Sequence, residues 1–324
     1  MNSYATDLST IYEAYERIKN VVHRTPVQTC RQLSRHGGAD IHFKCENLQK
    51  VGAFKYRGAS NVVLSLSDQQ ASAGVVTHSS GNHAQALALA AEQRGIPAHI
   101  VMPSNAPQVK QDAVAGYGAR IILCEPTLES RETTAAAIVA ETDATFIHPY
   151  NHAGIISGQA TVALELFEQV SNLDVIIAPV GGGGLLSGIA IAAKAINPAI
   201  RIVGAEPAGA DDAFRSKASG QLIAQTSPNT VADGLLTSLG DLTWPVVRDL
   251  VDEIVVVDDF QIISAMKLIM ERAKILTEPS GAVSYAAAVK IDFESADTSV
   301  ACVISGGNMN LSRISELIEN CRDR

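Results

Sequence analysis

The sequence predicts an α/β fold with two open parallel-sheet domains. Short apolar segments alternate with helical segments over most of the chain, and each apolar segment is hydrophobic throughout rather than at every second position. Continuously apolar strands are typical of parallel sheets that helices cover on both faces. With 47% hydrophobic and 18% charged residues, the chain can also bury a large core. We expect a larger domain from residues 1–73 and 152–324, with a smaller domain, 74–151, inserted into it.

The first part of the chain predicts a helix, a strand and a second helix. Apolar residues recur at helical spacing over 8–22, where Ser9 or Thr10 would cap the helix. After this helix, Thr25-Pro26-Val27 is predicted to be an extended segment. Apolar and polar residues alternate over 41–45, which predicts a strand, and residues 57–71 are predicted to form a helix.

Residues 75–147 repeat a strand–helix rhythm. The predicted strands cover 75–77, 98–102, 119–124 and 145–147, and the predicted helices cover 82–94, 109–117 and 129–141. Gly95 stands where a helix C-terminus favours glycine.

The second half predicts a larger block of the same kind. Its helices are expected at 158–170, 185–196, 260–273 and 281–289, and its strands at 175–180, 200–206, 254–257 and 300–305. Residues 208–243 are irregular and polar, so loops with one short helix are expected there. In such folds ligands lie beyond the carboxyl ends of the strands, which predicts a site between the two domains.

Composition favours a small-molecule partner over nucleic acid. The net charge is −9, whereas binding phosphate backbones requires a basic surface. The five cysteines form no CxxC pair, which indicates reduced thiols. No apolar run is long enough for a membrane helix, and residues 1–7 lack a signal pattern. We therefore expect a cytoplasmic protein.

Lys55 is the first candidate for chemistry. It stands where a loop containing Gly52 turns into a helix. The positive end of the helix dipole disfavours a charged lysine, and desolvation would lower its pKa further. A neutral lysine amine can form a Schiff base with an aldehyde. On this stretch alone, an ordinary solvated lysine is the simpler interpretation.

Four consecutive glycines, Gly181–Gly184, are the strongest local signal. They follow an apolar strand and open a helix, so their backbone N–H groups can converge on a phosphate. A tight turn is the structural alternative. A dinucleotide site is a third option and is disfavoured, because Ser187 stands where the third glycine of that motif belongs, although Glu206 lies near the expected distance.

Five motifs in order carry a resemblance to a known family. They are Ala53-Phe54-Lys55, Arg57-Gly58-Ala59, Ser80-Gly81-Asn82-His83, the glycine run and Ser305-Gly306-Gly307-Asn308. Together they resemble the fold-type II pyridoxal-phosphate (PLP) enzymes, within the group of serine racemases, threonine dehydratases and L-threo-3-hydroxyaspartate ammonia-lyases. The resemblance covers residues 25–308.

The resemblance implies a role for each of these motifs. Lys55 would hold PLP as a Schiff base, and Ser80 would be the base on the opposite face of the ring. The other cofactor contacts would come from Phe54, Asn82, Gly181, Gly182, Gly183, Gly184, Gly234 and Ser305, and the substrate carboxylate would be bound by Ser79, Ser80, Gly81, Asn82 and His83. A hydroxyl at Ser305 cannot protonate the pyridine nitrogen, which favours elimination or reprotonation over transamination.

Two further predictions concern charges. Glu206, the Ala210 carbonyl and Asp212 match the divalent-cation site of serine racemases, and oxygen ligands suit Mg²⁺ or Ca²⁺; a solvated acidic loop is the alternative. Arg131 is a candidate partner for a second substrate carboxylate, although a surface arginine would look the same. His148 and His152 are separated by Pro149, which argues against a helical metal pair.

The expected reaction is β-elimination from serine, threonine or L-threo-3-hydroxyaspartate, giving a keto acid and ammonia, together with racemisation. The loop Tyr150-Asn151-His152-Ala153 and Thr237 depart from the family pattern, so the substrate stays open. A homodimer without a regulatory domain, and a nucleotide effector near Gln85, Tyr117, Lys274 and Asn308, are also implied. Three alternatives are a β-replacement synthase of the cysteine-synthase type, a NAD-dependent dehydrogenase and a non-catalytic amino-acid-binding protein.

Overall fold

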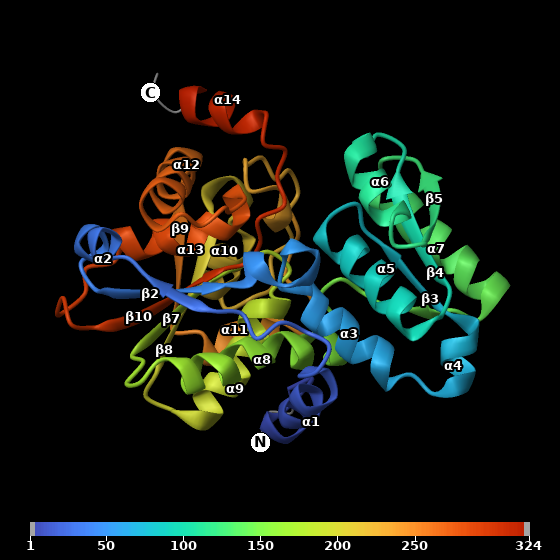
Figure 1. The fold of residues 1–324 in the computed structure, drawn as a ribbon, viewed down its shortest axis with the longest axis horizontal. Coiled ribbons are helices and arrows are strands. Elements are labelled where there is room, and N and C mark those ends of the chain that lie inside the picture. Colours follow the sequence, from blue (N-terminus) through green and yellow to red (C-terminus); the bar gives the residue numbers. More distant parts are fainter. Residues whose placement is uncertain (1–3, 321–324) are drawn as a thin grey trace.

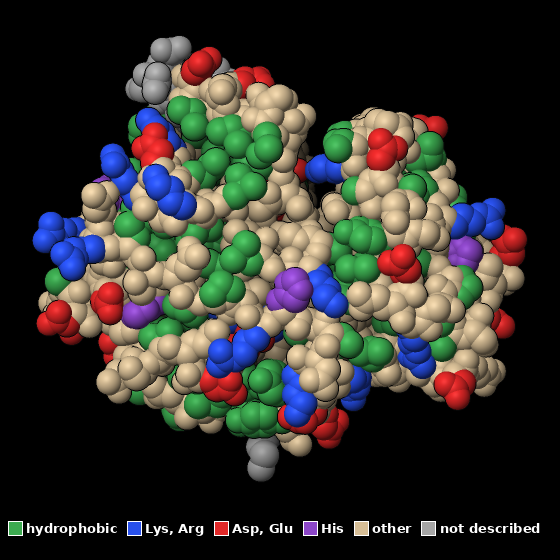
Figure 2. All heavy atoms as spheres, in the orientation of Figure 1, with side chains coloured by type: hydrophobic (Ala, Val, Ile, Leu, Met, Phe, Trp, Pro, Cys, Tyr) green, Lys and Arg blue, Asp and Glu red, His purple; other side chains and the backbone are tan. Residues whose placement is uncertain are grey.

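The computed structural model describes residues 4–320, which form two lobes, each built on one sheet (Figure 1). The larger sheet has six strands in the order β1-β2-β10-β7-β8-β9, and the smaller has four in the order β5-β4-β3-β6. Figure 2 shows a hollow between the two lobes on the face that it displays. The predicted α/β class with two open sheets is confirmed.

The six-stranded sheet is parallel except at one edge, where β1 pairs antiparallel with β2. Its strands are β1 (Val27–Thr29), β2 (Asp40–Cys45), β7 (Val175–Pro179), β8 (Arg201–Pro207), β9 (Glu253–Val257) and β10 (Ser299–Ile304). The first strand was predicted only as an extended exit, because three residues carry no period that can be recognised.

Helices cover both faces of this sheet, as its continuously apolar strands require. Alternate residues of β7 show the two faces: Ile176 packs in one buried cluster and Ile177 in the other. The first cluster contains residues of α1 (Leu8–Ile18), α8 (Ala153–Gln169), α9 (Gly184–Ile196), α10 (Asp212–Ser219) and α11 (Trp244–Leu250). The second contains residues of α2 (Arg31–Gly37), α12 (Asp259–Leu268) and α13 (Pro279–Lys290), with α14 (Arg313–Asn320) packed against it.

The four-stranded sheet is parallel throughout and lies within residues 74–151. Its strands are β3 (Val75–His78), β4 (Ala98–Pro103), β5 (Arg120–Cys124) and β6 (Thr145–Phe146). One face packs against α5 (Asn82–Arg94) and α6 (Gln108–Ala115), and the other against α7 (Leu128–Thr142). We propose that this sheet is the framework of the smaller domain; the limits of that domain stay a prediction.

Helix α3 (Lys55–Ser65) joins the two lobes, because it packs on both α5 and α8. Two glycines permit the close contact with α8: a Cβ at Gly158 would lie 2.6 Å from the Cα of Gly58. The predicted helix over 57–71 is wrong in its extent. Leu66 is extended, and Ser67 begins α4 (Asp68–Ala73) with a capping box that includes Gln70.

Other element limits also differ from the predictions. Helix α1 ends at Ile18 rather than at residue 22. Asp7, rather than Ser9 or Thr10, caps α1 by accepting a hydrogen bond from the backbone N–H of Thr10. Helix α8 begins at Ala153 instead of residue 158, because the ring of His152 caps it. The helix predicted over 260–273 ends as α12 at Leu268 and continues as a π-helix, Ile269–Ala273. Four 3-10 turns complete the described chain: Glu46–Leu48, Lys50–Gly52, Ala208–Ala210 and Asp233–Leu235.

In the described part of the chain, no helix is both long and apolar enough to cross a membrane. The cysteines there, Cys30, Cys45, Cys124 and Cys302, are free, as predicted. Cys321 and Met1 lie outside the described residues.

Candidate active site

The amine of Lys55 is enclosed at the start of α3. The helix begins at Lys55 and has no side-chain cap, as the sequence predicts for a residue at the positive end of the helix dipole. The Nζ atom donates to the carbonyl oxygen of Pro149 at 2.8 Å and lies 5.2 Å from the centroid of the Phe54 ring. Although Lys55 as a whole is only half-buried, burial of its amine lowers the pKa to about 8. A reactive neutral amine is therefore accessible near neutral pH.

Three of the predicted cofactor contacts meet at the carboxyl end of β10. The backbone N–H of Phe54 donates to Ser305 O at 3.1 Å, which places Ser305 beside the start of α3. Ser280 connects Ser305 to Gly234: Ser305 Oγ donates to Ser280 O at 3.5 Å, and Gly234 N donates to Ser280 Oγ at 3.0 Å. Sequence reasoning missed Ser280, because a serine in the first turn of a helix looks like an ordinary helix residue.

The glycine run joins β7 to α9 and is fully buried. Gly183 has φ +84°, and a Cβ there would lie 2.7 Å from Cδ2 of Leu239. A Cβ on Gly182 would lie 2.3 Å from the ring of Tyr150. Leu239 and Tyr150 thus approach the run so closely that no larger residue fits at Gly183 or Gly182. In addition, no side chain caps the first N–H groups of α9. This geometry fits a phosphate cradle.

One two-residue segment connects the lysine with the glycine run, although the two are far apart in the sequence. The carbonyl of Pro149 accepts the bond from Lys55, and the next residue, Tyr150, packs its ring against Gly182 and its backbone against Gly184. The lysine and the glycine run therefore both contact this one segment. The sequence marks this loop only as an unusual variant, and its contacts depend on the tertiary fold.

The loop from Ser79 to His83 begins α5 without a serine cap. Gly81 occupies the N-cap position, and no side chain caps the helix. Ser79 Oγ instead accepts a bond from Gly81 N at 3.3 Å. No serine hydroxyl therefore caps α5, and the first N–H groups of the helix remain available to an anion such as a carboxylate.

Asn82 belongs to a polar chain that includes Glu278. Asn82 Nδ2 donates to Glu278 Oε1 at 2.9 Å, and Asn308 Nδ2 donates to Asn82 Oδ1, also at 2.9 Å. Burial raises the pKa of Glu278 to about 8, so this carboxyl is largely neutral at pH 7. Sequence reasoning missed Glu278; the signal was a glutamate directly before Pro279 at a helix start.

Neutral histidines line the same region. Burial, and secondarily the charge of Lys55, lowers the pKa of His83 well below its usual value. Its Nδ1 is buried without a partner among the described residues. Burial also lowers the pKa of His148 to about 4, and its Nδ1 accepts bonds from the backbone of Tyr150 and Asn151. His152 Nδ1 accepts from Gly154 N at 3.1 Å.

Arg131 lies on α7, near the loop that precedes α5. Its Nε donates to the carbonyl oxygen of Thr127, the N-cap residue of this helix, at 3.3 Å. Its charge also contributes to lowering the pKa of His78, after the larger effect of burial. His78 ends β3 directly before Ser79. A role for Arg131 with the substrate stays a prediction.

The predicted cation ligands Glu206, Ala210 and Asp212 are buried between β8 and α10. Glu206 accepts 2.8 Å bonds from the backbone N–H groups of Ala213 and Phe214, and Asp212 Oδ2 accepts from Leu239 N at 3.0 Å. Burial raises the pKa to about 8 for Glu206 and about 6 for Asp212. Asp212 Oδ1 has no hydrogen-bond partner within residues 4–320. An orphaned oxygen beside a second carboxyl fits a cation, whose presence stays a prediction; among the described residues, no group of three or more His, Cys, Asp or Glu side chains is placed so that it could hold a metal ion.

The arrangement suits a ligand with an aldehyde and a phosphate. Helices α3, α5 and α9 all begin without side-chain caps, so their dipoles and free N–H groups favour anions. A lysine amine with a lowered pKa stands at the start of α3, and a glycine cradle stands at the start of α9. Contacts within the described chain thus bring together Lys55, Phe54, Asn82, Gly181–Gly184, Gly234 and Ser305. Their individual roles stay predictions.

Comparison with known proteins gives a consistent result. Residues 18–306 match the family described as "Pyridoxal-phosphate dependent enzyme". The chain is 53% identical to a serine racemase from Arabidopsis thaliana over 316 residues, covering 96% of each chain. It is 48% identical over 311 residues to a beta-hydroxyaspartate dehydratase from Paracoccus denitrificans, covering 96% of this chain and 99% of that one. The structure of maize serine racemase superposes with a TM-score of 0.94 at 52% identity, covering 99% of each chain.

Proposed function

Because this chain belongs to the family of pyridoxal-phosphate dependent enzymes, we propose that it converts a β-hydroxy amino acid to a keto acid and ammonia and also racemises it. The similarity to serine racemases and to a beta-hydroxyaspartate dehydratase supports this proposal. The candidate substrates are serine, L-threo-3-hydroxyaspartate and threonine. The observation that carries the proposal is the shared contact of Lys55 and the glycine run with Pro149 and Tyr150.

The residues of the cleft fit the cofactor. Lys55 would hold the aldehyde, and the free N–H groups at Gly181–Gly184 would hold the phosphate. Phe54 and Gly234 would cover the two ring faces, with Asn82 at the ring hydroxyl and Ser305 at the pyridine nitrogen. Bound PLP withdraws electrons from the substrate, which acidifies the Cα–H bond and promotes loss of a β-hydroxyl.

Two groups of this chain would move protons. Lys55 Nζ would take the Cα proton on one face, and its lowered pKa of about 8 places it in the range where a general base works well near neutral pH. Ser80 Oγ would act on the opposite face. Removal on one face and return on the other inverts the carbon, whereas removal followed by loss of the hydroxyl leads to the keto acid. A pair of acids on opposite faces supports both outcomes.

The remaining residues would orient the substrate. The uncapped start of α5, from Ser79 to His83, would bind its α-carboxylate. The neutral hydroxyl of Ser305 would leave the pyridine nitrogen unprotonated, which favours elimination or racemisation over transamination. Arg131 would bind a second carboxylate, which would favour hydroxyaspartate over serine. We also propose Mg²⁺ or Ca²⁺ at Glu206, Ala210 and Asp212; the homodimer, the nucleotide effector and the cytoplasmic location stay predictions.

A keto-acid assay tests the function directly. The enzyme is incubated separately with serine, threonine and the four hydroxyaspartate stereoisomers, and the remaining amino acid is analysed on a chiral column. We expect ammonia and keto acid in equal amounts from at least one substrate, with some inversion of serine. The proposal would be wrong if none of these amino acids gave product with the PLP-loaded enzyme.

A β-replacement synthase is the remaining alternative, because it would use the same lysine and cofactor. Incubation with serine and sulfide separates the two reactions. Cysteine formation at a rate comparable to that of the keto acid would favour the synthase, and its absence would exclude it.

A further inference from the structure

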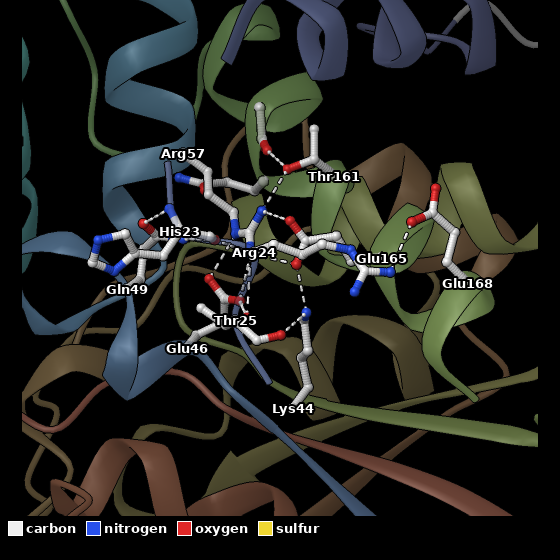
Figure 3. A network of polar contacts seen from close by, with 12 residues as sticks. His23, Arg24, Thr25, Lys44, Glu46, Gln49, Arg57, Thr161, Glu165 and Glu168 are labelled. Carbon is white, nitrogen blue, oxygen red and sulfur yellow. Dashed lines mark hydrogen bonds and ion pairs between the residues drawn. The ribbon is translucent and has the colours of Figure 1, made fainter. Parts of the chain in front are cut away.

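Four charged side chains form a buried cluster behind the start of α3 (Figure 3). Lys44 comes from β2, Glu46 from the turn after it, Arg57 from α3 and Glu165 from α8. Each of these side chains is at most 2% exposed. Two positive and two negative charges balance one another, which is the condition under which charges can be buried.

Arg57 is at the centre of this cluster. It makes two bonds to Glu46, from Nε to Oε2 at 2.7 Å and from Nη2 to Oε1 at 2.8 Å. It makes two more to Glu165, from Nη1 to Oε1 at 2.7 Å and from Nη2 to Oε2 at 2.9 Å. A planar guanidinium held by two carboxylates has one orientation, and a lysine could not reproduce these paired bonds.

Lys44 belongs to the same cluster but does not bond to α3. Its Nζ donates to Glu165 Oε2 at 2.5 Å, to Gln169 Oε1 at 2.8 Å and to Thr25 O at 2.8 Å. All three donors of this ammonium therefore have acceptors. Lys44 is linked to Arg57 only through Glu165. It can therefore serve as a control, because it is a buried charge of the same cluster that makes no bond to the helix that carries Lys55.

The relation between Arg57 and Lys55 is set by the helix. Residues two positions apart in an α-helix differ by about 200° around the helix axis. Arg57 therefore points to the side of α3 opposite Lys55. Lys55 faces Pro149, in the loop before α8, and Arg57 bonds to Glu165 within α8. Gly58 presses on the same helix, because a Cβ there would lie 2.6 Å from Nε2 of Gln159. The first turn of α3 is thus fixed on both sides.

We propose that Arg57, clamped between Glu46 and Glu165, is a positioning residue that fixes the direction in which Lys55 presents its amine to the cofactor. The inference rests on the proposed role of Lys55. Without the clamp, the first turn of α3 can rotate and shift, and the amine loses its alignment with a cofactor whose phosphate is held on α9. Lys44 stabilises the fold but does not set this alignment.

The test compares holoenzymes that lose different parts of the cluster. Arg57→Lys keeps the charge and removes the paired bonds, Glu46→Gln keeps the shape and weakens one pair, and Lys44→Met removes a buried charge that does not bond to α3. For each, thermal unfolding is measured, together with the visible absorbance band of lysine-bound PLP and the rate at which that band is lost on dilution. We expect at least tenfold faster loss and a displaced band for Arg57→Lys, and a smaller change in the same direction for Glu46→Gln. Lys44→Met should lower the unfolding temperature but change the rate less than twofold.

Two results would overturn the inference. The first is that Arg57→Lys leaves the absorbance band and its rate of loss unchanged. The second is that Lys44→Met changes the band and the rate as much as Arg57→Lys does, when the two variants lose the same amount of thermal stability. If Arg57→Lys does not fold, Glu46→Gln decides between the same outcomes. Lys55→Ala separates failure of this inference from failure of the proposed function, because a visible band that survives Lys55→Ala contradicts the role of Lys55 itself.

Discussion

The pKa of Lys55 bears directly on its proposed role in binding the cofactor. An ordinary lysine has a pKa of 10.5, whereas burial lowers that of Lys55 to about 8. About a tenth of the amine is then neutral at pH 7, against far less than a hundredth for a solvated lysine. The helix start was visible in the sequence; the enclosure that adds desolvation was not, because it depends on residues brought in from other parts of the chain, Pro149 among them.

This residue gives the first prediction. The rate at which cofactor-free protein binds PLP should rise with pH and level off above about 8, because only the neutral amine attacks the aldehyde. Stopped-flow absorbance measures this rate. Lys55→Ala should lose the visible band and all turnover, while a midpoint near that of free lysine would contradict the enclosed amine.

Glu278 gives a second prediction at this scale. Its pKa is raised from 4.5 to about 8 by burial, so the folded state favours the neutral form. A carboxyl of this kind costs stability progressively as pH rises above 4.5, and the full cost is reached above about 8. Cofactor-free protein should therefore unfold at a lower temperature at pH 9 than at pH 6. Glu278→Gln keeps the shape of the side chain and stays neutral, so it should reduce the difference in unfolding temperature between pH 6 and pH 9, measured by calorimetry. If the difference is the same in this variant, the pH dependence comes from Glu206 and Asp212 instead.

At the scale of elements, the glycine run between β7 and α9 permits a matched comparison. Gly183 and Gly118 both have positive φ, +84° and +71°, so alanine strains the backbone at either position. Only at Gly183 would the added Cβ meet other atoms, at 2.7 Å from Leu239 and 2.9 Å from Thr243. We expect Gly118→Ala to cost about 1 kcal/mol of stability with unchanged PLP affinity. Gly183→Ala should lower that affinity at least tenfold by equilibrium titration; similar affinities for the two variants would contradict the cradle.

The segment from β8 to α10 predicts how a divalent cation binds. Glu206 and Asp212 have raised pKa values of about 8 and 6 without a cation, and a cation requires their ionised forms. Affinity for Mg²⁺ or Ca²⁺ should therefore increase as pH rises from 6 to 8.5, and the bound ion should raise the unfolding temperature. Calorimetry with and without chelator measures both effects. Asp212→Asn should abolish the rise of cation affinity with pH. If chelator does not change the unfolding temperature at pH 8.5, no cation binds at this site.

Helix limits show what sequence periodicity could and could not predict. The predicted helix over 82–94 matches α5, because an alanine-rich segment ended by Gly95 carries both its period and its stop signal. The start of α8 was missed by five residues, since its cap is a histidine ring, outside the usual set of capping residues. The break after Ser65 was missed because it depends on the Ser67–Gln70 capping box, which competes with a continuous helical period.

At the scale of the whole molecule, one ion pair bridges the two lobes. Lys110 on α6 lies 3.0 Å from Asp233, next to Gly234 on the other lobe. Both side chains are substantially exposed, so the pair is worth at most about 1 kcal/mol. Asp233→Asn should raise KM less than about fivefold at low salt and leave kcat nearly unchanged. High salt should erase the difference, and a difference that persists at high salt would point to a role other than charge pairing.

The site as a whole could be predicted only in part. Motifs near Lys55, Gly181 and Ser305 were recognisable because each combines a rare residue pattern with a strand or helix end. Tyr150, Ser280 and Glu278 were not, because what makes them notable is their contact with Gly182, Gly234 and Asn82, which lie far from them in the sequence. The buried cluster around Arg57 was equally hidden: Arg57 lies in a recognised motif, but Lys44, Glu46 and Glu165 come from three other elements and look in sequence like ordinary surface charges.

The crossing of Gly58 and Gly158 has a consequence for how descendants of this chain can diverge. A single methyl group at either glycine would collide with the opposite helix. Neither glycine can therefore be substituted while the two helices keep their present distance. Loops such as the one around Gly81, where an added Cβ would meet no atom within 4 Å, carry no such restriction. Mutational scanning under selection should therefore find new specificities among those loops and an almost immutable pair of glycines at the pivot behind them.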